Sequence, residues 1–202
     1  MVESDSLRVL DILANASAII AEGEVAQLIT ANDTATSEED YLFVIRSKTA
    51  ALFAAACEVG AIIADHSTAA TEALERYGAN LGIAFQLVDD YLDYAATDDA
   101  FGKGVGDDFR DGKITLPVVL AMRRGNEEEH AFWQRTLEDC KQSEADLARA
   151  LEILTAREAL SDTLIRARGY ADTARAALAN LPDNAHREAL EKVVDFCVDR
   201  AY

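Results

Sequence analysis

The chain has 202 residues, of which 37 are acidic and 19 basic, giving a formal net charge of −18. A protein that binds nucleic acid over a broad face needs a basic surface, so this charge argues against a nucleic-acid partner. Half of the residues are hydrophobic, which is enough for a sizeable core and excludes charge-driven disorder. To bind an anionic ligand, such a chain would need a local source of positive charge, such as a metal ion or a few lysines at the site.

The composition is that of an all-α protein. Alanine occurs 38 times, whereas glycine (10) and proline (2), which disfavour helices, are scarce. The three cysteines, Cys57, Cys140 and Cys197, are far apart and odd in number, which predicts reduced packing residues in a cytoplasmic protein. We find no signal peptide and no apolar stretch near the ~20 residues of a membrane span, so we expect no transmembrane segment.

Apolar residues recur at the helical period through the first half of the chain and predict long helices within residues 5–96. The first covers 5–33, the second 37–66 and the third 67–96. The second begins with Ser37, which has Asp40 three residues on. This spacing is typical of a capping box, in which the two residues satisfy each other's backbone NH groups.

The composition changes over residues 97–112, which contain four glycines and predict the main loop of the chain. Thr115 and Pro117 then indicate an N-cap and a first helical turn, opening a short helix that ends before Gly125. Four further helices are expected, over 127–140, 144–155, 158–179 and 184–200. Since no repeat or linker interrupts 1–202, we predict a single domain, with C-terminal helices over 116–202.

An acidic motif near the end of the third helix is the most informative stretch. At ~100° per residue, four polar side chains fall within an arc of about 100° on one helix face: Gln86, Asp89, Asp90 and Asp93. Three half-desolvated carboxylates repel one another unless a cation neutralises them, and hard oxygen ligands suit Mg²⁺. The sequence therefore predicts a magnesium site, the alternative being a solvated acidic face.

Lysines occur near this motif in two contexts. Lys103 lies in the glycine-rich loop, where its ammonium and nearby backbone NH groups could receive a diphosphate. The alternative is that this loop only connects two helices, because it matches no standard phosphate-binding motif. Lys48, in an alanine-rich helix, either extends to water or points into a cavity that holds an anion.

Five motifs occur in order along the chain: Gly23-Glu24-x-x-Gln27, Lys48-Thr49-Ala50-x-Leu52-Phe53, Phe85-Gln86-x-x-Asp89-Asp90-x-x-Asp93, Gly102-Lys103-x-x-Gly106-Asp107-Asp108 and Gly112-Lys113-x-Thr115-Leu116-Pro117. Together they resemble the trans-polyprenyl diphosphate synthases, in particular the long-chain type that makes octaprenyl or decaprenyl diphosphate for ubiquinone side chains. The resemblance implies an isoprenoid-synthase-like helical bundle around a central cavity, usually a homodimer.

The implied reaction adds isopentenyl diphosphate units to an allylic diphosphate. By the resemblance, the metal ligands are the three carboxylates of the second aspartate-rich motif. The diphosphate would be contacted by Lys48 and Lys103, and the developing cation would face the oxygen dipoles of Thr49 and Gln86. Asp107 and Lys113 would lie near the same substrate site.

The chain also departs from the family pattern. The family carries an upstream Gly-Gly-Lys-Arg segment and a first DDxxD motif, and neither is found here. We expect the chain to begin just downstream of that motif, to lack the family's N-terminal helices, and to be inactive or impaired alone. An alternative is a non-catalytic or half-site subunit whose partner supplies the first motif. A class I terpene cyclase is disfavoured, because its second metal motif is missing.

Overall fold

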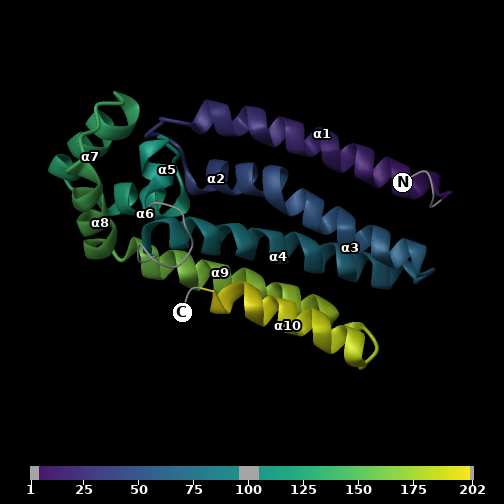
Figure 1. Cartoon of the computed structure of the whole chain (residues 1–202). Helices are drawn as coiled ribbons and strands as arrows, with labels where there is room; N and C mark the ends of the chain where they lie inside the picture. The colour runs from purple at the N-terminus through teal and green to yellow at the C-terminus, as the bar shows by residue number, and fades with distance from the viewer. Residues whose placement is uncertain (1–4, 96–104, 201–202) are drawn as a thin grey trace.

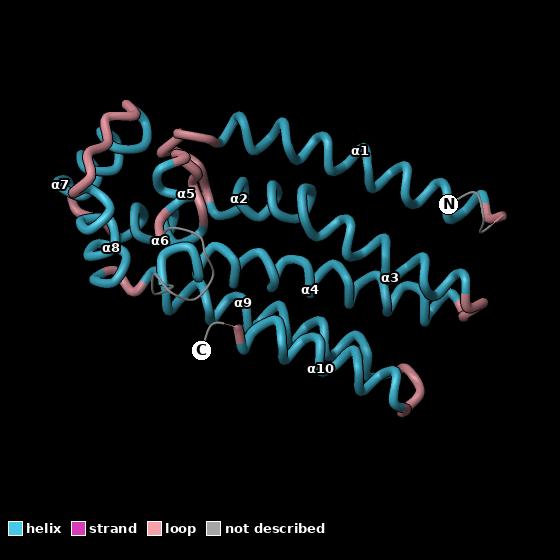
Figure 2. Tube along the Cα trace, in the orientation of Figure 1, coloured by secondary structure: helices cyan, strands magenta, loops and turns pink. Residues whose placement is uncertain are grey.

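The structure, a computed structural model, describes residues 5–95 and 105–200. This part of the chain is all-α and contains no strand (Figures 1 and 2), which confirms the predicted fold class. The helices are α1 (Leu7–Thr30), α2 (Glu38–Ile45), α3 (Ala51–Ile63), α4 (Thr68–Ala95), α5 (Asp107–Arg110), α6 (Leu116–Arg124), α7 (Glu127–Trp133), α8 (Asp146–Ala156), α9 (Ala159–Ala177) and α10 (Ala185–Asp199).

The long helices lie side by side. In Figure 1, α1, α3, α4 and α9 follow one another across the molecule, α10 packs beside α9, and α5 to α8 gather at one end. Glycines allow α3 and α4 to approach at backbone distance. A Cβ on Gly78 would lie 2.4 Å from the Phe53 carbonyl oxygen, and one on Gly82 would lie 2.6 Å from the Ala50 Cα. This contact sets the position of the α4 segment that carries the acidic motif.

Two clusters of buried side chains form the core. The larger joins α2 and the end of α4 to α6, α7 and α8, and its fully buried members include Leu87, Leu116, Leu120, Trp133 and Leu154. The smaller joins α4 to α9 and α10 around Tyr77, Leu81 and Leu178. The acidic motif of α4 therefore lies beside the better packed end of the molecule.

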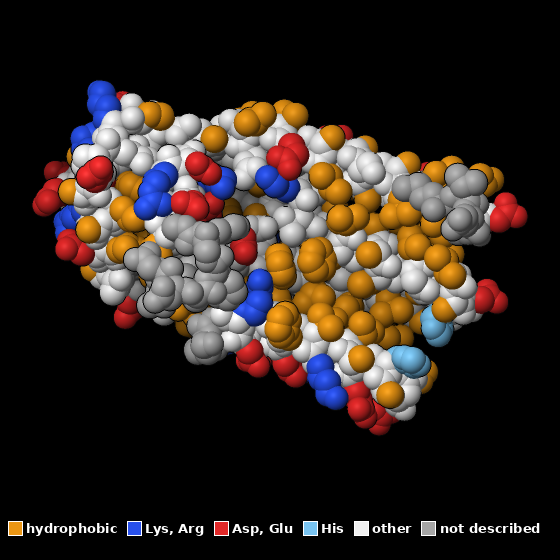
Figure 3. Space-filling model, in the orientation of Figure 1, with side chains coloured by type: hydrophobic (Ala, Val, Ile, Leu, Met, Phe, Trp, Pro, Cys, Tyr) orange, Lys and Arg blue, Asp and Glu red, His pale blue; other side chains and the backbone are white. Residues whose placement is uncertain are grey.

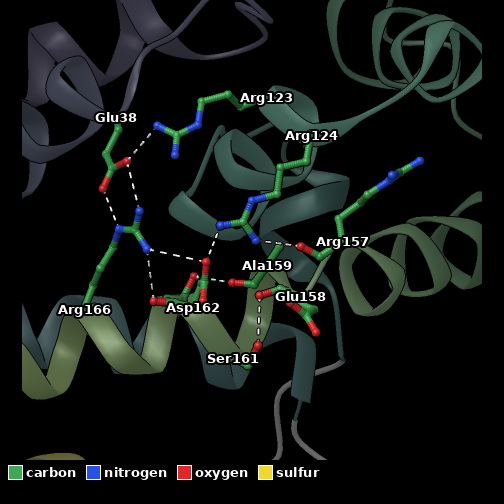
Figure 4. Close-up of polar contacts among 10 residues, drawn as sticks. Glu38, Arg123, Arg124, Arg157, Glu158, Ala159, Ser161, Asp162 and Arg166 are labelled. Carbon is green, nitrogen blue, oxygen red and sulfur yellow. Dashed lines mark hydrogen bonds and ion pairs between the residues drawn. The ribbon is translucent and has the colours of Figure 1, made fainter.

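The start of α2 is held from several sides. Ser37 and Asp40 form the expected capping box. Glu38, the first residue of α2, accepts hydrogen bonds from Arg166 Nε at 2.6 Å and Nη2 at 3.3 Å, and from Arg123 Nη1 at 3.4 Å. Figure 4 shows these contacts and the adjoining ion pair between Arg124 and Asp162. The network ties α2 to α6 and α9.

The largest departures from the sequence-based expectations lie in and beside the glycine-rich segment. Residues 107–110, expected in the loop, form the short helix α5, which follows Gly106 in a left-handed conformation at φ 79°. Thr115 is the N-cap of α6, but its hydroxyl makes no capping hydrogen bond. Cys140 is exposed, so it is not a packing residue, whereas Cys197 is buried; all three cysteines are free.

Helix α1 is apolar but largely exposed. Only three of its residues are buried, and its exposed large side chains include Leu7, Leu10, Val25, Leu28 and Ile29. By length and composition Leu7–Thr30 could cross a membrane, whereas we expected no apolar stretch of that length from the sequence. This is weak evidence for a span, because helices of other kinds meet the same test.

Candidate active site

A cavity of about 290 Å³ lies where α1, α2, α4 and the segment before α6 meet. Six of the residues singled out from the sequence line it together: Lys48, Thr49, Gln86, Asp89, Asp90 and Lys113. Asp93 and Asp107 do not line it, and Lys103 lies outside the described residues. The structure thus brings together residues that are up to 65 positions apart in the sequence, from Lys48 to Lys113.

The three motif carboxylates of α4 have different environments. Asp89 is exposed and lines the cavity. Asp90 is only 3% exposed, and burial, with smaller contributions from Asp108 and Asp89, raises the pKa of its carboxyl group to about 7. Asp93 is half-buried, and burial followed by the charge of Asp108 raises its pKa to about 6. Their location on one helix does not make them equivalent.

A chain of hydrogen bonds links Asp90 to Thr49. The Tyr41 hydroxyl donates to Asp90 Oδ2 at 2.5 Å, and Gln86 Nε2 donates to Asp90 Oδ1 at 2.8 Å. The Thr49 hydroxyl donates to Gln86 Oε1 at 3.0 Å. Both Asp90 oxygens are therefore held, and the Gln86 amide has a defined orientation between two partners.

Lys48 points toward the end of α1 rather than away from the cavity. Its Nζ donates to Gln27 Oε1 at 2.6 Å and lies 3.2 Å from Glu24 Oε2. Lys48 and Thr49 belong to a π-helical turn over Arg46–Ala50, between α2 and α3. Such turns add one residue to a helical turn and are frequent at functional sites. Here it places consecutive side chains on the cavity wall.

The segment around α5 also lines the cavity, through Asp108 and Lys113. Lys113 Nζ bonds Asp108 Oδ1 at 2.7 Å and lies 3.2 Å from Asp111 Oδ2. These acidic partners raise the pKa of Lys113 against the lowering effect of its burial, so the side chain stays cationic. The Asp108 backbone NH donates to Asp93 Oδ2 at 3.1 Å. Asp93 therefore supports the wall that carries Asp108 and Lys113.

Two titratable cavity residues, Tyr41 and Asp108, received no role from the sequence. Tyr41 precedes Lys48 by seven positions, which is about two helical turns, and this spacing is a signal that could have placed the two on one helix face. No polar pattern distinguished Tyr41 from a core aromatic. Asp108 was quoted within a motif, but its ion pair with Lys113 depends on the turn over 111–112 between them. Gly112 allows that turn, because its φ of 70° is left-handed and a Cβ would meet Asn32 Oδ1 at 1.9 Å.

The donors of this cavity fit a hard cation in their chemistry. Carboxylate oxygens of Asp89, Asp90 and Asp108 share the wall, and oxygen is the ligand that Mg²⁺ prefers. Within residues 5–95 and 105–200, no group of three or more His, Cys, Asp or Glu side chains has the spacing to hold a metal ion by itself. A bound cation would therefore need further ligands, such as water or phosphate oxygens.

A hydrophobic surface adjoins this polar region. Figure 3 shows apolar side chains gathered over the α3, α4 and α10 side of the molecule. Large exposed hydrophobic residues of α3 and α10 are Leu52, Ile63, Val193 and Phe196. The same molecule thus presents a charged cavity and a broad apolar area.

Known proteins share this sequence and arrangement. A family profile described as polyprenyl synthetase matches residues 1–154. The octaprenyl diphosphate synthase of Haemophilus influenzae is 44% identical over 198 residues, covering 98% of this chain and 60% of that protein. The enzyme of the same name from Escherichia coli is 42% identical over 200 residues, covering 99% and 62%.

Solved structures show the same fold. A decaprenyl diphosphate synthase from Rhodobacter capsulatus superimposes with a TM-score of 0.95 at 49% identity, covering all of this chain and 62% of that one. A polyprenyl synthase from Caulobacter crescentus, complexed with calcium and isoprenyl diphosphate, gives 0.95 at 51% identity, again covering all of this chain and 62% of that one. The chain spans about three-fifths of the length of these relatives. By profile, sequence and fold, it belongs to the polyprenyl synthetase family.

Proposed function

We propose that the chain is part of a long-chain trans-prenyltransferase, which adds isopentenyl diphosphate units to an allylic diphosphate. The observation that carries this proposal is a single cavity lined by two lysines and two carboxylates, namely Lys48, Lys113, Asp89 and Asp90. In a chain of net charge −18, paired lysines at an acidic cavity favour an anion bridged by a cation over a simple anion site. The names of the relatives support diphosphate chemistry and a long product.

In the proposed reaction, the C–O bond of the allylic diphosphate breaks and the diphosphate leaves. The double bond of isopentenyl diphosphate attacks the allylic cation to form a C–C bond, and a proton is then lost. Lys48 and Lys113 bind phosphate oxygens, with Lys103 and Asp107 of the same segment as further substrate-binding residues. Thr49 and Gln86 direct oxygen dipoles toward the cation, where fixed dipoles are more effective than mobile water.

Asp89, Asp90 and Asp93 are the proposed positions for holding Mg²⁺. When bound there, Mg²⁺ would neutralise negative charge on the leaving diphosphate. The exposed Asp89 carboxylate is the most accessible of the three, whereas Asp90 and Asp93 are engaged by protein donors. This arrangement favours Asp89 for the direct contact and the other two for its support.

An alternative proposal is a subunit that supplies half of a composite site. It is favoured by the absence, among the described residues, of a carboxylate group able to hold a metal alone. The exposed apolar residues of α1 support association with another chain, and a homodimer is the simplest such assembly. A partner chain carrying a first aspartate-rich motif is the other candidate.

The decisive experiment is an elongation assay on the purified chain with Mg²⁺, an allylic diphosphate and isopentenyl diphosphate. Product length is measured by chromatography. Elongation by the chain alone would show prenyltransferase activity but would contradict both the half-site alternative and the expectation that the chain is inactive or impaired alone. Elongation only after addition of a partner chain supports the alternative. Failure to bind Mg²⁺ and pyrophosphate in calorimetry would contradict both.

A further inference from the structure

We propose that Tyr41 is a positioning residue that acts on the reaction through Asp90 and Gln86. The inference rests on the proposed function for its kinetic consequence but on contacts within this chain for its geometry. No motif in the sequence marked Tyr41. The structure assigns it a place at the start of the hydrogen-bonded chain that ends at Thr49.

The Tyr41 ring has little freedom to move. Its side chain is 4% exposed and belongs to the larger core cluster, with Ile45 and Leu87. Tyr41 lies one turn after Glu38, which Arg166 and Arg123 hold at the start of α2 (Figure 4). The hydroxyl is thus anchored by core packing on its own helix and by ion pairs from α6 and α9. Such an anchor suits a group that must hold another side chain in place.

The Tyr41 hydroxyl fixes the Asp90 carboxyl group, and Asp90 in turn orients Gln86. In its ionised form the Asp90 carboxylate only accepts hydrogen bonds, so its Oδ1 requires a donor and selects the NH₂ end of Gln86. The Gln86 carbonyl oxygen then faces Thr49 and accepts the Thr49 hydroxyl proton. With that proton engaged, the acceptor capacity of the Thr49 oxygen remains for the cavity, which Thr49 lines.

Loss of the Tyr41 hydroxyl would remove the first hydrogen bond of the series that runs through Asp90 and Gln86 to Thr49. Asp90 Oδ2 would be left buried without the only hydrogen bond it makes to a described residue. The carboxylate would be free to rotate, and the Gln86 amide would no longer have a fixed partner. The effect on the reaction would therefore reach Thr49 and Gln86, which face the developing cation, rather than the lysines that bind diphosphate. A kcat defect with a nearly unchanged KM is expected.

The test is Tyr41→Phe, which removes one oxygen atom and keeps the ring. Tyr94→Phe is a matched control, because the Tyr94 hydroxyl is also buried, one turn after Asp90 on α4, but makes no hydrogen bond to Asp90, Gln86 or Thr49. Tyr77→Phe is a second control, since it removes a hydrogen bond to the Leu190 carbonyl oxygen far from the cavity. It reports what a lost buried hydrogen bond does through stability alone.

The first readout does not require turnover. The chain has four glutamines, so labelling with ¹⁵N-glutamine gives a small set of side-chain amide signals, and Gln86→Met assigns the one of interest. We expect the Gln86 signals to shift and to exchange faster with water in Tyr41→Phe, and to stay in place in both controls. Unchanged Gln86 signals in folded Tyr41→Phe, or equal changes in Tyr94→Phe, would overturn the proposal.

The second readout is kinetic and uses the active assembly, the chain alone or with its partner. Tyr41→Phe is expected to lower kcat about tenfold and to change KM for either diphosphate by less than about twofold, because misorientation rather than binding is affected. A proportional loss in Tyr77→Phe would assign the effect to stability and contradict positioning. If no assembly turns over, the proposed function fails, whereas the amide readout still decides the role of Tyr41.

Should Tyr41→Phe fail to fold, 3-fluorotyrosine placed at position 41 retains the hydroxyl and gives a ¹⁹F signal. That signal is expected to move on Asp90→Asn and to stay in place on Asp107→Asn, since Asp107 bonds Arg110 outside the cavity. A ¹⁹F signal that does not move on Asp90→Asn would contradict the hydrogen bond between Tyr41 and Asp90 on which the inference depends.

Discussion

Helices α1 and α4 are the two longest of the described chain and differ sharply in burial. α4 has 28 residues and buries twelve of them, among them Leu87 and Asp90, whereas α1 has 24 residues and buries three. Helices pack on α4 from both sides, α3 on one and α9 and α10 on the other, whereas α1 packs mainly against the α2 to α3 side. A helical hydrophobic pattern therefore predicts a helix, while its neighbours decide how much of that helix is core.

The largest effect is expected in the core of α4. Leu87 is fully buried beside the acidic motif, so Leu87→Ala should lower the free energy of unfolding by about 2–5 kcal/mol through lost burial and a residual cavity. Urea unfolding followed by circular dichroism measures it. Leu10→Ala on α1, 47% exposed, is the control and should cost far less. Equal losses would contradict the contrast between the two helices.

The next effect is catalytic and concerns the exposed end of the α4 motif. Asp89→Ala should lower kcat by at least ~100-fold in the active assembly, because the carboxylate proposed to contact Mg²⁺ is removed. Asp172→Ala, a solvent-exposed carboxylate of α9 that pairs with Arg175, is the control. Turnover near the normal rate in Asp89→Ala would show that the magnesium assignment is wrong.

A third prediction concerns pH and the buried end of the same motif. Because burial raises the pKa of Asp90 from its ordinary 3.8 to about 7, the folded chain retains a proton that the unfolded chain loses over that interval. Stability without metal should therefore fall as the pH rises from about 4 to 7. Asp90→Asn should melt above the wild type at pH 8, by the equivalent of at least ~1 kcal/mol, since one pKa unit corresponds to about 1.4 kcal/mol.

At about pH 3, below the ordinary pKa of 3.8, the wild-type and Asp90→Asn chains should melt at similar temperatures, because the wild-type carboxyl is then largely protonated in both the folded and the unfolded state. Thermal melts at the two pH values, with a chelator present, provide the comparison. A variant that melts below the wild type at pH 8 would show that the hydrogen bonds from Tyr41 and Gln86 outweigh the burial of the charge.

The smallest effect is expected on the outer face of α1. Leu28 is 77% exposed, so Leu28→Ser should change the free energy of unfolding by less than about 0.5 kcal/mol. If this face joins copies of the chain, the same substitution should weaken self-association in analytical ultracentrifugation. If the substitution lowers stability but leaves self-association unchanged, the Leu28 side chain stabilises the fold of the single chain and does not contribute to an interface.

Sequence reasoning predicted well the features that depend on local preference. Helix limits follow capping residues and hydrophobic period, as the capping box of Ser37 and Asp40 shows. The residues of the candidate site were predicted only in part. Six of its residues line one cavity, but the participation of Tyr41 and the pairing of Asp108 with Lys113 depend on contacts between distant segments. The roles of these residues in catalysis stay predictions.

The sequence by itself determined that the protein is all-α, where its long helices lie, and that it belongs to the polyprenyl synthetase family, because these follow from local propensity and ordered motifs. Only the tertiary structure decided which face of each helix is buried and which of three neighbouring carboxylates is accessible. The physical reason is that burial and hydrogen bonding arise from whatever packs against a helix. Both carboxylates line the cavity, but Asp89 is exposed, whereas Asp90, one residue later, is buried and held by Tyr41 and Gln86.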